Sequence, residues 1–239
     1  MKKRLFWLLA FSLAIFLNGV AQPSAESDTS VAVAIVYDTS GSMAESVRDG
    51  SGKMSPKYVI ANRALTSVIN RLQDVANSKT NPRKVRCSLV IFEGNGAREA
   101  VKFGELDAGQ LTAWVKAFNK PFGATPLGEA IRVAAQPLLQ LKSKHKHILV
   151  LTDGINTAGP QPSEVIPKLK ADAERYESAV SFHFVAFDVA AKVFDPVKKL
   201  NVTVVGAANE KELNTQLDFI VEKKILLEEE EPPAKADKK

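Results

Sequence analysis

Uninterrupted apolar runs alternate along this chain with segments in which apolar residues recur every three or four positions. Runs that are apolar at every position, such as 31–37, are typical of strands buried on both faces of a parallel sheet. The spacing of three or four is that of one helix face, and it is clearest at 61, 65, 68, 72 and 75. Strands are therefore predicted at 31–37, 85–92, 99–103, 147–152, 180–187 and 202–206, and helices at 56–76, 107–118, 126–141, 163–177, 190–199 and 210–227.

This alternation predicts an α/β fold of three layers, in which a mainly parallel six-stranded sheet is covered by helices on both faces. The segment 93–97, with its two glycines, has the composition of a hairpin turn. The strand that follows this turn is therefore expected to be one antiparallel edge strand. Nothing in the pattern divides the region 31–227, so we expect a single domain there.

The N-terminal segment has the pattern of an export signal. Three basic residues at 2–4 precede the apolar run 5–17, which is too short to cross a bilayer comfortably. Small residues at Gly19 and Ala21 then suit a cleavage site. We predict a signal peptide over 1–21 and a linker over 22–30, hence an exported protein that is periplasmic or secreted. The alternative is an uncleaved segment that anchors the protein to the inner membrane.

Composition and charge narrow the function classes. The chain is 45% hydrophobic and 25% charged, as in ordinary globular proteins, with a net charge of +5 at pH 7. Three of these positive charges lie in the predicted signal peptide, so the remainder is close to neutral and gives no reason to expect nucleic-acid binding. The single cysteine, Cys87, excludes a disulfide within the chain and is expected to be buried. The tail 228–239 is predicted to be disordered, because it is charged and contains prolines.

Oxygen-bearing side chains follow two predicted strands and precede one predicted helix. Asp38, Ser40 and Ser42 follow the first strand, Asp153 follows the fourth, and Thr125 precedes the third helix. Open α/β sheets bind ligands beyond the carboxyl ends of their strands, and alternate residues of an extended loop project to one side. We therefore expect these five side chains to meet. Carboxylates and hydroxyls without histidine or cysteine suit Mg²⁺, or else Mn²⁺.

Three further residues are expected to support this metal site. Gly41 should allow a tight bend between the two serines, and Gly154 directly follows Asp153. Asp188 ends its strand on the same side, where it either supports the metal ligands or caps a helix. Because the site holds only two carboxylates and Mg²⁺ prefers six ligands, a carboxylate from outside the chain is expected to complete the shell.

Three segments resemble the von Willebrand factor A family across about 31–227: VAIVYDTSGSM (33–43), GATPLGEAI (123–131) and ILVLTDG (148–154). In that family they form the metal-ion-dependent adhesion site, whose five positions match here as Asp38, Ser40, Ser42, Thr125 and Asp153. The resemblance implies a Rossmann-like, doubly wound sheet of order 3-2-1-4-5-6. It also implies Mg²⁺ binding and metal-bridged recognition of a Glu or Asp side chain on a protein partner. The missing disulfides fit a bacterial exported member.

A catalytic function is not expected, because a metal-assisted reaction needs a nucleophile or a general base beside the metal. No histidine is predicted near Ser40 or Ser42, and the spare acids at suitable strand ends are Glu93 and Asp188. A metal-dependent hydrolase that uses these acids is the alternative. A subunit that assembles an envelope complex is a further possibility, and it differs from an adhesin mainly in its partner.

Two segments outside the site are also assigned from their composition. The polar segment 44–55 is expected to be a surface loop on the rim of the metal face, where it could tune partner choice. The basic run 142–147, with His145 and His147, is predicted to be a solvated turn rather than a metal site. His183 lies in an apolar strand and is expected to be a core histidine with its hydrogen bonds satisfied.

Overall fold

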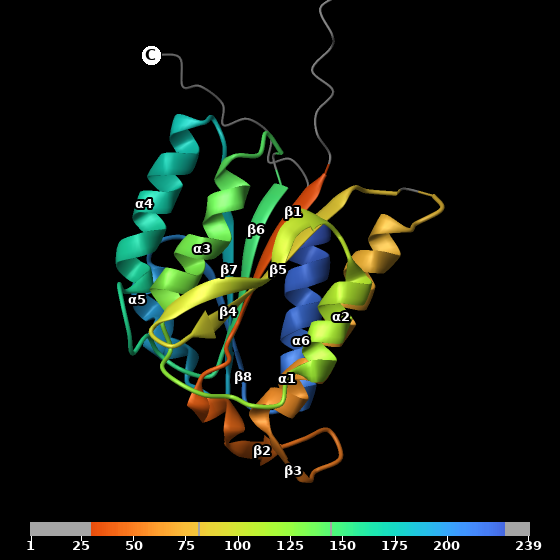
Figure 1. The fold of residues 1–239 in the computed structure, drawn as a ribbon, viewed down its shortest axis with the longest axis vertical. Helices are drawn as coiled ribbons and strands as arrows, with labels where there is room; N and C mark the ends of the chain where they lie inside the picture. The colour runs from red at the N-terminus through yellow and green to blue at the C-terminus, as the bar shows by residue number, and fades with distance from the viewer. Residues whose placement is uncertain (1–29, 81, 144, 228–239) are drawn as a thin grey trace, which may run out of the picture.

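The computed structural model describes residues 30–80, 82–143 and 145–227 (Figure 1). The predicted signal peptide, the tail and all of the linker except residue 30 lie outside these residues. Among the described residues, no helix combines the length and the apolar character that crossing a membrane would need.

The core of the fold is a six-stranded sheet of order β5-β4-β1-β6-β7-β8. All neighbouring pairs are parallel except β4 and β5, which pair antiparallel at the edge. The order and the single antiparallel strand confirm the predicted 3-2-1-4-5-6 sheet. The strands are β1 (Val31–Tyr37), β4 (Val85–Glu93), β5 (Gly96–Glu105), β6 (His145–Thr152), β7 (Ser181–Phe187) and β8 (Thr203–Ala207).

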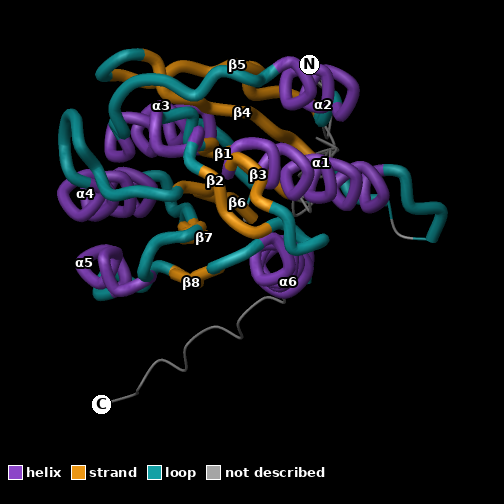
Figure 2. Tube along the Cα trace, turned by 90° about the horizontal axis from the view of Figure 1, so that it is seen from below, coloured by secondary structure: helices purple, strands orange, loops and turns teal. Residues whose placement is uncertain are grey.

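Helices cover both faces of the sheet (Figure 2). The alternating side chains of β1 fill a core on each side. Val33 and Ile35 face one helix layer, whereas Ala32 and Ala34 face the other, and all four are fully buried. The first layer holds α1 (Lys57–Ala76), α2 (Ala108–Ala117) and α6 (Glu210–Phe219). The second holds α3 (Leu127–Leu139), α4 (Pro162–Arg175) and α5 (Asp195–Lys198).

The segment 44–55 is not the irregular loop that its polar composition predicts. After a 3₁₀ turn at Gly41–Ala44, strands β2 (Ser46–Arg48) and β3 (Met54–Pro56) form an antiparallel hairpin. The Asp49 carboxylate accepts hydrogen bonds from the backbone N–H groups of Ser51 and Lys53, which closes the turn through local side-chain contacts. Only Val47 of the hairpin strands is buried, so the apolar pattern of a strand is missing.

Three predicted elements differ in extent. The edge strand is longer than 99–103 because β5 pairs with β4 from Gly96 to Glu105, although most of its side chains are partly exposed. The predicted helix 190–199 is a 3₁₀ turn at Ala191–Phe194 followed by the short α5, which starts next to Pro196. The predicted helix 210–227 changes at Ile220 into a π-helix, Ile220–Leu226, whose wider turn brings Ile220 and Ile225 onto the core.

The prediction of a solvated turn at 142–147 is wrong in its second half, because β6 begins at His145. His147 is fully buried, and its Nδ1 lies 3.2 Å from Nε2 of His183, with the two rings stacked. Burial lowers the pKa of both imidazoles, that of His183 to about 4. His183 is buried as expected, but its Nδ1 has no hydrogen-bond partner in the described part of the chain. Cys87 is buried as well, and burial raises the pKa of its thiol to about 12.

Candidate metal site

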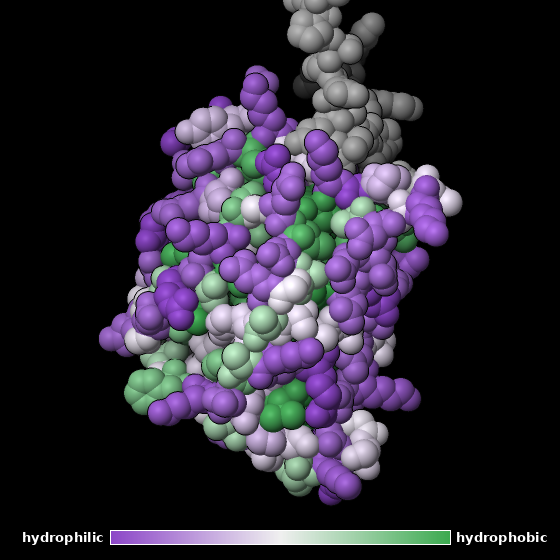
Figure 3. All heavy atoms as spheres, turned by 45° about the vertical axis from the view of Figure 1, so that its right-hand side comes forward, coloured by the Kyte–Doolittle hydropathy of each residue, from purple (hydrophilic) through white to green (hydrophobic). Residues whose placement is uncertain are grey.

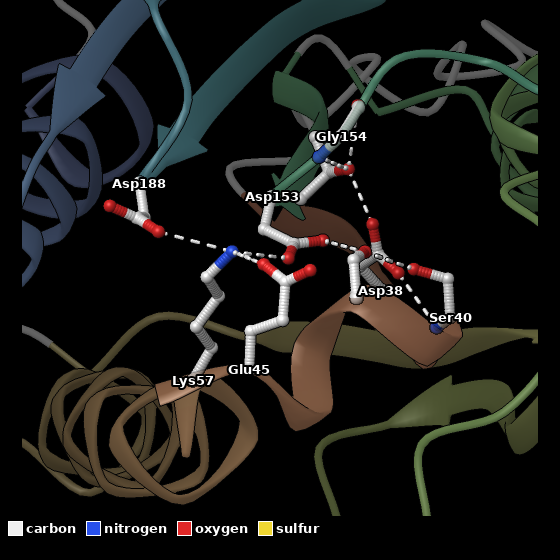
Figure 4. Close-up of polar contacts among 9 residues, drawn as sticks. Asp38, Ser40, Glu45, Lys57, Asp153, Gly154 and Asp188 are labelled. Carbon is white, nitrogen blue, oxygen red and sulfur yellow. Dashed lines mark hydrogen bonds and ion pairs between the residues drawn. The ribbon is translucent and has the colours of Figure 1, made fainter. Parts of the chain in front are cut away.

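The carboxyl ends of β1 and β6 meet at the point where the strand order reverses. Tyr37 and Leu151 are opposite each other in the parallel pair, so Asp38 and Asp153 leave the sheet at the same edge. The backbone N–H of Asp38 donates to the carbonyl of Leu151 at 3.0 Å, which continues the ladder into the site. The two carboxylates therefore come together because their strands are neighbours, although 114 residues of chain separate them (Figure 4).

Asp38 is the most enclosed group of the site. Its Oδ1 accepts a hydrogen bond of 2.8 Å from the backbone N–H of Ser40, and its Oδ2 accepts one of 2.5 Å from the Thr152 hydroxyl. Complete burial and the nearby charge of Asp153 nevertheless raise the pKa of the Asp38 carboxyl to about 6. Asp38 therefore ionises at a cost, which a bound cation would offset.

The two serines converge through a turn rather than through an extended loop. Ser42 lies in the 3₁₀ turn, where its hydroxyl donates to Asp153 Oδ1 at 2.8 Å and lies 3.1 Å from the Ser40 hydroxyl. Gly41 does not have the left-handed backbone of a tight glycine bend, and an added Cβ would meet the Gly123 carbonyl at an ordinary 3.7 Å. The backbone at this position therefore does not need the conformational freedom of glycine.

Thr125 lies at the same edge, from the loop that leads into α3. Its hydroxyl is 3.9 Å from the position that a Cβ on Gly154 would occupy, which places it beside the Asp153 loop. The Thr125 N–H donates to the Thr157 hydroxyl, and the Thr157 N–H donates back to the Thr125 carbonyl. Helix α3 starts after Pro126 without a side-chain cap, so the Thr125 hydroxyl does not serve as the N-cap.

The donor set formed by these residues fits a hard divalent cation. Direct hydrogen bonds join Asp38, Ser40, Ser42 and Asp153, and Thr125 lies next to them. No group of three or more His, Cys, Asp or Glu side chains in the described ranges is arranged to hold a metal ion. A metal here would therefore need the serine and threonine hydroxyls, whose oxygens suit Mg²⁺ or Mn²⁺ and not zinc.

Two residues at the site, Thr152 and Lys57, carry no signal in the sequence that predicts their role. The Nζ of Lys57 lies 2.9 Å from Glu45 Oε2, 3.0 Å from Asp153 Oδ2 and 3.1 Å from Asp188 Oδ2 (Figure 4). Burial by itself would lower the pKa of the Lys57 ammonium, but the hydrogen bonds to these three carboxylates outweigh burial and raise it. Asp188, which has a left-handed φ of 54°, therefore pairs with Lys57 and does not cap a helix.

The other spare acid, Glu93, lies apart from this cluster. Its exposed carboxylate is 3.1 Å from the Arg98 guanidinium across the β4–β5 turn. A groove of about 420 Å³ lies beside this turn, with Thr39, Phe92 and Trp114 among its lining residues. Phe122, also in the groove, is 78% exposed, and its N–H donates to the Thr39 carbonyl, so an apolar ring stands next to the Asp38 loop. The face of the molecule in Figure 3 is largely hydrophilic, with separate apolar areas.

One protein family matches most of this chain. A family model for the von Willebrand factor type A domain matches residues 32–216, and the chain therefore belongs to that family. A search of curated proteins found no match.

Solved structures with the same fold include three pilus proteins. The PilB minor pilin of Streptococcus sanguinis is 19% identical, with a TM-score of 0.58 over 83% of this chain and 62% of the pilin. The pilus adhesin SpaC of Lactobacillus rhamnosus GG is 14% identical, with a TM-score of 0.60 over 82% of this chain and 31% of SpaC. The vWF domain of the type V pili tip protein Mfa5 of Porphyromonas gingivalis is 12% identical, with a TM-score of 0.62 over 87% and 99%. The chain thus spans less than two thirds of the length of PilB and of SpaC. The structural similarity to these three proteins shows that they share the fold.

Proposed function

We propose that this protein is an exported, non-enzymatic adhesion module that holds one Mg²⁺ ion and uses it to bind an acidic side chain of a protein partner. Asp38, Ser40, Ser42, Thr125 and Asp153 would hold the ion. The observation that carries the proposal is the joining of two buried carboxylates and two serine hydroxyls by direct hydrogen bonds at the strand-order switch point. A bound Mg²⁺ supplies a hard Lewis acid with open coordination positions for an outside oxygen.

The surroundings of the site favour a protein as the partner. Phe122 and Ile155 are exposed large apolar side chains on loops that follow or contact the metal-site segments. Exposed apolar groups beside a polar centre are typical of protein interaction surfaces. The pilus proteins that share the fold are consistent with an exported adhesin, as is the predicted signal peptide.

The same geometry disfavours the hydrolase alternative. Glu93 and Asp188 were the candidate general bases, but Glu93 pairs with Arg98 and Asp188 pairs with Lys57. Each of these carboxylates is thus engaged by a cationic side chain, and among the described residues Glu93 makes no contact with Asp38 or Asp153. We therefore assign the metal a binding role and not a catalytic one.

The test is a titration with Mn²⁺ measured by isothermal calorimetry. It compares the wild type with Asp38→Asn and Ser42→Ala. Asp74→Asn serves as the matched control, because Asp74 is an exposed aspartate near the C-terminal end of α1. We expect one binding event in the wild type and the control, and none in Asp38→Asn. Equal binding by all four proteins would falsify the assignment of the site. A capture experiment tests the partner. The wild type should retain an envelope protein in the presence of Mg²⁺, and this binding should be lost with a chelator and in Asp38→Asn.

A further inference from the structure

A single ammonium group joins three separate loops at the edge of the candidate metal site. Lys57 is the first residue of α1 and is only 3% exposed, so its charge is withdrawn from water. Glu45 follows the 3₁₀ turn, Asp153 follows β6, and Asp188 follows β7. All three carboxylates reach Nζ within 3.1 Å, as the dashed lines in Figure 4 show. A buried lysine is costly unless such partners surround it.

The two carboxylate oxygens of Asp153 have different partners, because Lys57 contacts only one of them. Nζ lies on the Oδ2 side at 3.0 Å, while Oδ1 accepts from the Ser42 hydroxyl at 2.8 Å. A carboxylate held at both oxygens has little freedom to rotate. The ammonium therefore leaves Oδ1 to the serine hydroxyls, which are the proposed metal ligands.

The buried charges of the site give Lys57 a second effect. Asp38, Asp153 and Lys57 are almost fully buried, whereas the side chains of Glu45 and Asp188 are 68% and 37% exposed and are screened by water. The three buried groups together carry one net negative charge, which a divalent cation turns into one net positive charge. Without Lys57 the same site would carry two negative charges and become neutral on binding the cation.

We infer that Lys57 is a charge-setting residue of this site: it leaves the metal-loaded site cationic, so that the carboxylate of a partner neutralises it. This inference rests on the proposed function. It has two opposite consequences, because the same positive charge repels the metal ion and attracts the anionic partner. If Lys57 only anchored the start of α1, its replacement would change the stability of the protein but neither the affinity for the metal ion nor the affinity for the partner.

The experiment compares Lys57→Met with the wild type and with Lys53→Met, which alters an exposed lysine of the neighbouring hairpin. Calorimetric titration with Mn²⁺ should give a dissociation constant about tenfold lower for Lys57→Met and unchanged for Lys53→Met. Acetate serves as the anionic probe, and its methyl proton line is broadened by protein-bound Mn²⁺. At equal saturation with Mn²⁺, the acetate concentration for half-maximal broadening should be several-fold higher for Lys57→Met.

A second variant keeps the inference testable if Lys57→Met does not fold. Asp188→Asn removes one counter-charge of Lys57 and retains a side chain that tolerates the left-handed backbone at this position. It should weaken Mn²⁺ binding about two- to threefold, which is opposite to the effect of Lys57→Met. Unchanged or weaker Mn²⁺ binding by a folded Lys57→Met, or unchanged or tighter binding by Asp188→Asn, overturns the inference. A wild type that binds no Mn²⁺ instead refutes the proposed function, and the inference falls with it.

Discussion

Replacing Asp38 with asparagine should stabilise the metal-free protein at neutral pH while it abolishes metal binding. Asp38 is fully buried, and its carboxyl has a pKa of about 6 instead of 3.8. The amide has nearly the same shape and carries no charge. Its oxygen can accept from the Ser40 N–H, and its NH₂ can donate to the Thr152 hydroxyl, which has the Gly154 carbonyl at 3.1 Å as an acceptor of its own.

The magnitude follows from the difference in pKa between the folded and unfolded states. The folded pKa is raised, so the folded protein binds more protons than the unfolded chain between pH 3.8 and about 6. The contribution of Asp38 to the unfolding free energy of the metal-free wild type is therefore fully present below pH 3.8 and is lost as pH rises through about 6. A shift of this size corresponds to about 3 kcal/mol at pH 7, which is the upper limit of what Asp38→Asn can recover.

Urea unfolding of both proteins with EDTA at pH 7 and at pH 4.5 measures this effect. The buried histidines act with the opposite sign, because their lowered pKa values remove stability as pH falls below about 6.5. They are present in both proteins, so the difference in unfolding free energy at each pH isolates Asp38. We expect Asp38→Asn to be more stable at pH 7 by about 2–3 kcal/mol and the difference to shrink at pH 4.5. A variant that is less stable at pH 7, or a difference that does not depend on pH, refutes the reasoning.

Three further predictions concern other parts of the molecule. His183→Gln should remove the acid sensitivity that His183 itself contributes, so that the variant's loss of unfolding free energy relative to wild type is about 2 kcal/mol smaller at pH 5 than at pH 7. Glu210→Gln should cost about 1–2 kcal/mol in the same assay, because Glu210 accepts two hydrogen bonds from Arg63 and one from the Gly50 N–H; an unchanged midpoint would contradict this. Phe122→Ala should reduce capture of an envelope partner and leave the melting temperature and Mn²⁺ affinity unchanged, since the ring is exposed; a lowered melting temperature would show that the ring is structural.

The elements that sequence predicts well are those whose side chains face the core on both sides. β1 and the part of β6 from Ile148 to Leu151 are uninterrupted apolar runs between helix layers, so their composition alone predicts that they are buried. The β2–β3 hairpin carries no such pattern, because hydrogen bonds to the Asp49 carboxylate close its turn and one buried valine, Val47, packs on the core. The π-helix escapes prediction for a different reason: its apolar residues still suit an α-helix, and only packing selects the wider turn.

The site residues could be predicted because strand topology fixes where strand ends lie. Once β1 and β6 are neighbours, residues that follow them must meet, whatever the intervening chain does. Lys57 could not be found in this way. It lies at the start of an amphipathic helix, where an exposed lysine is ordinary, and its partners are 12, 96 and 131 positions away in sequence. Only the packing of α1 against the strand ends turns it into a buried cation.

The buried charges of Asp38, Asp153 and Lys57 predict that the stability of the domain depends on the bound metal. Lys57 contacts Asp153 and leaves Asp38 without a cationic partner among the described ion pairs, so one ionised carboxylate remains a cost in the metal-free protein at pH 7. On the proposed function, a divalent ion at a hundred times its dissociation constant adds about 2.7 kcal/mol of stability, which is similar to the cost of ionising Asp38. The bound metal would then restore the unfolding free energy that the ionised Asp38 carboxylate costs. Asp38→Asn would gain this free energy without a metal, but it would lose the ion through which the site binds an acidic partner.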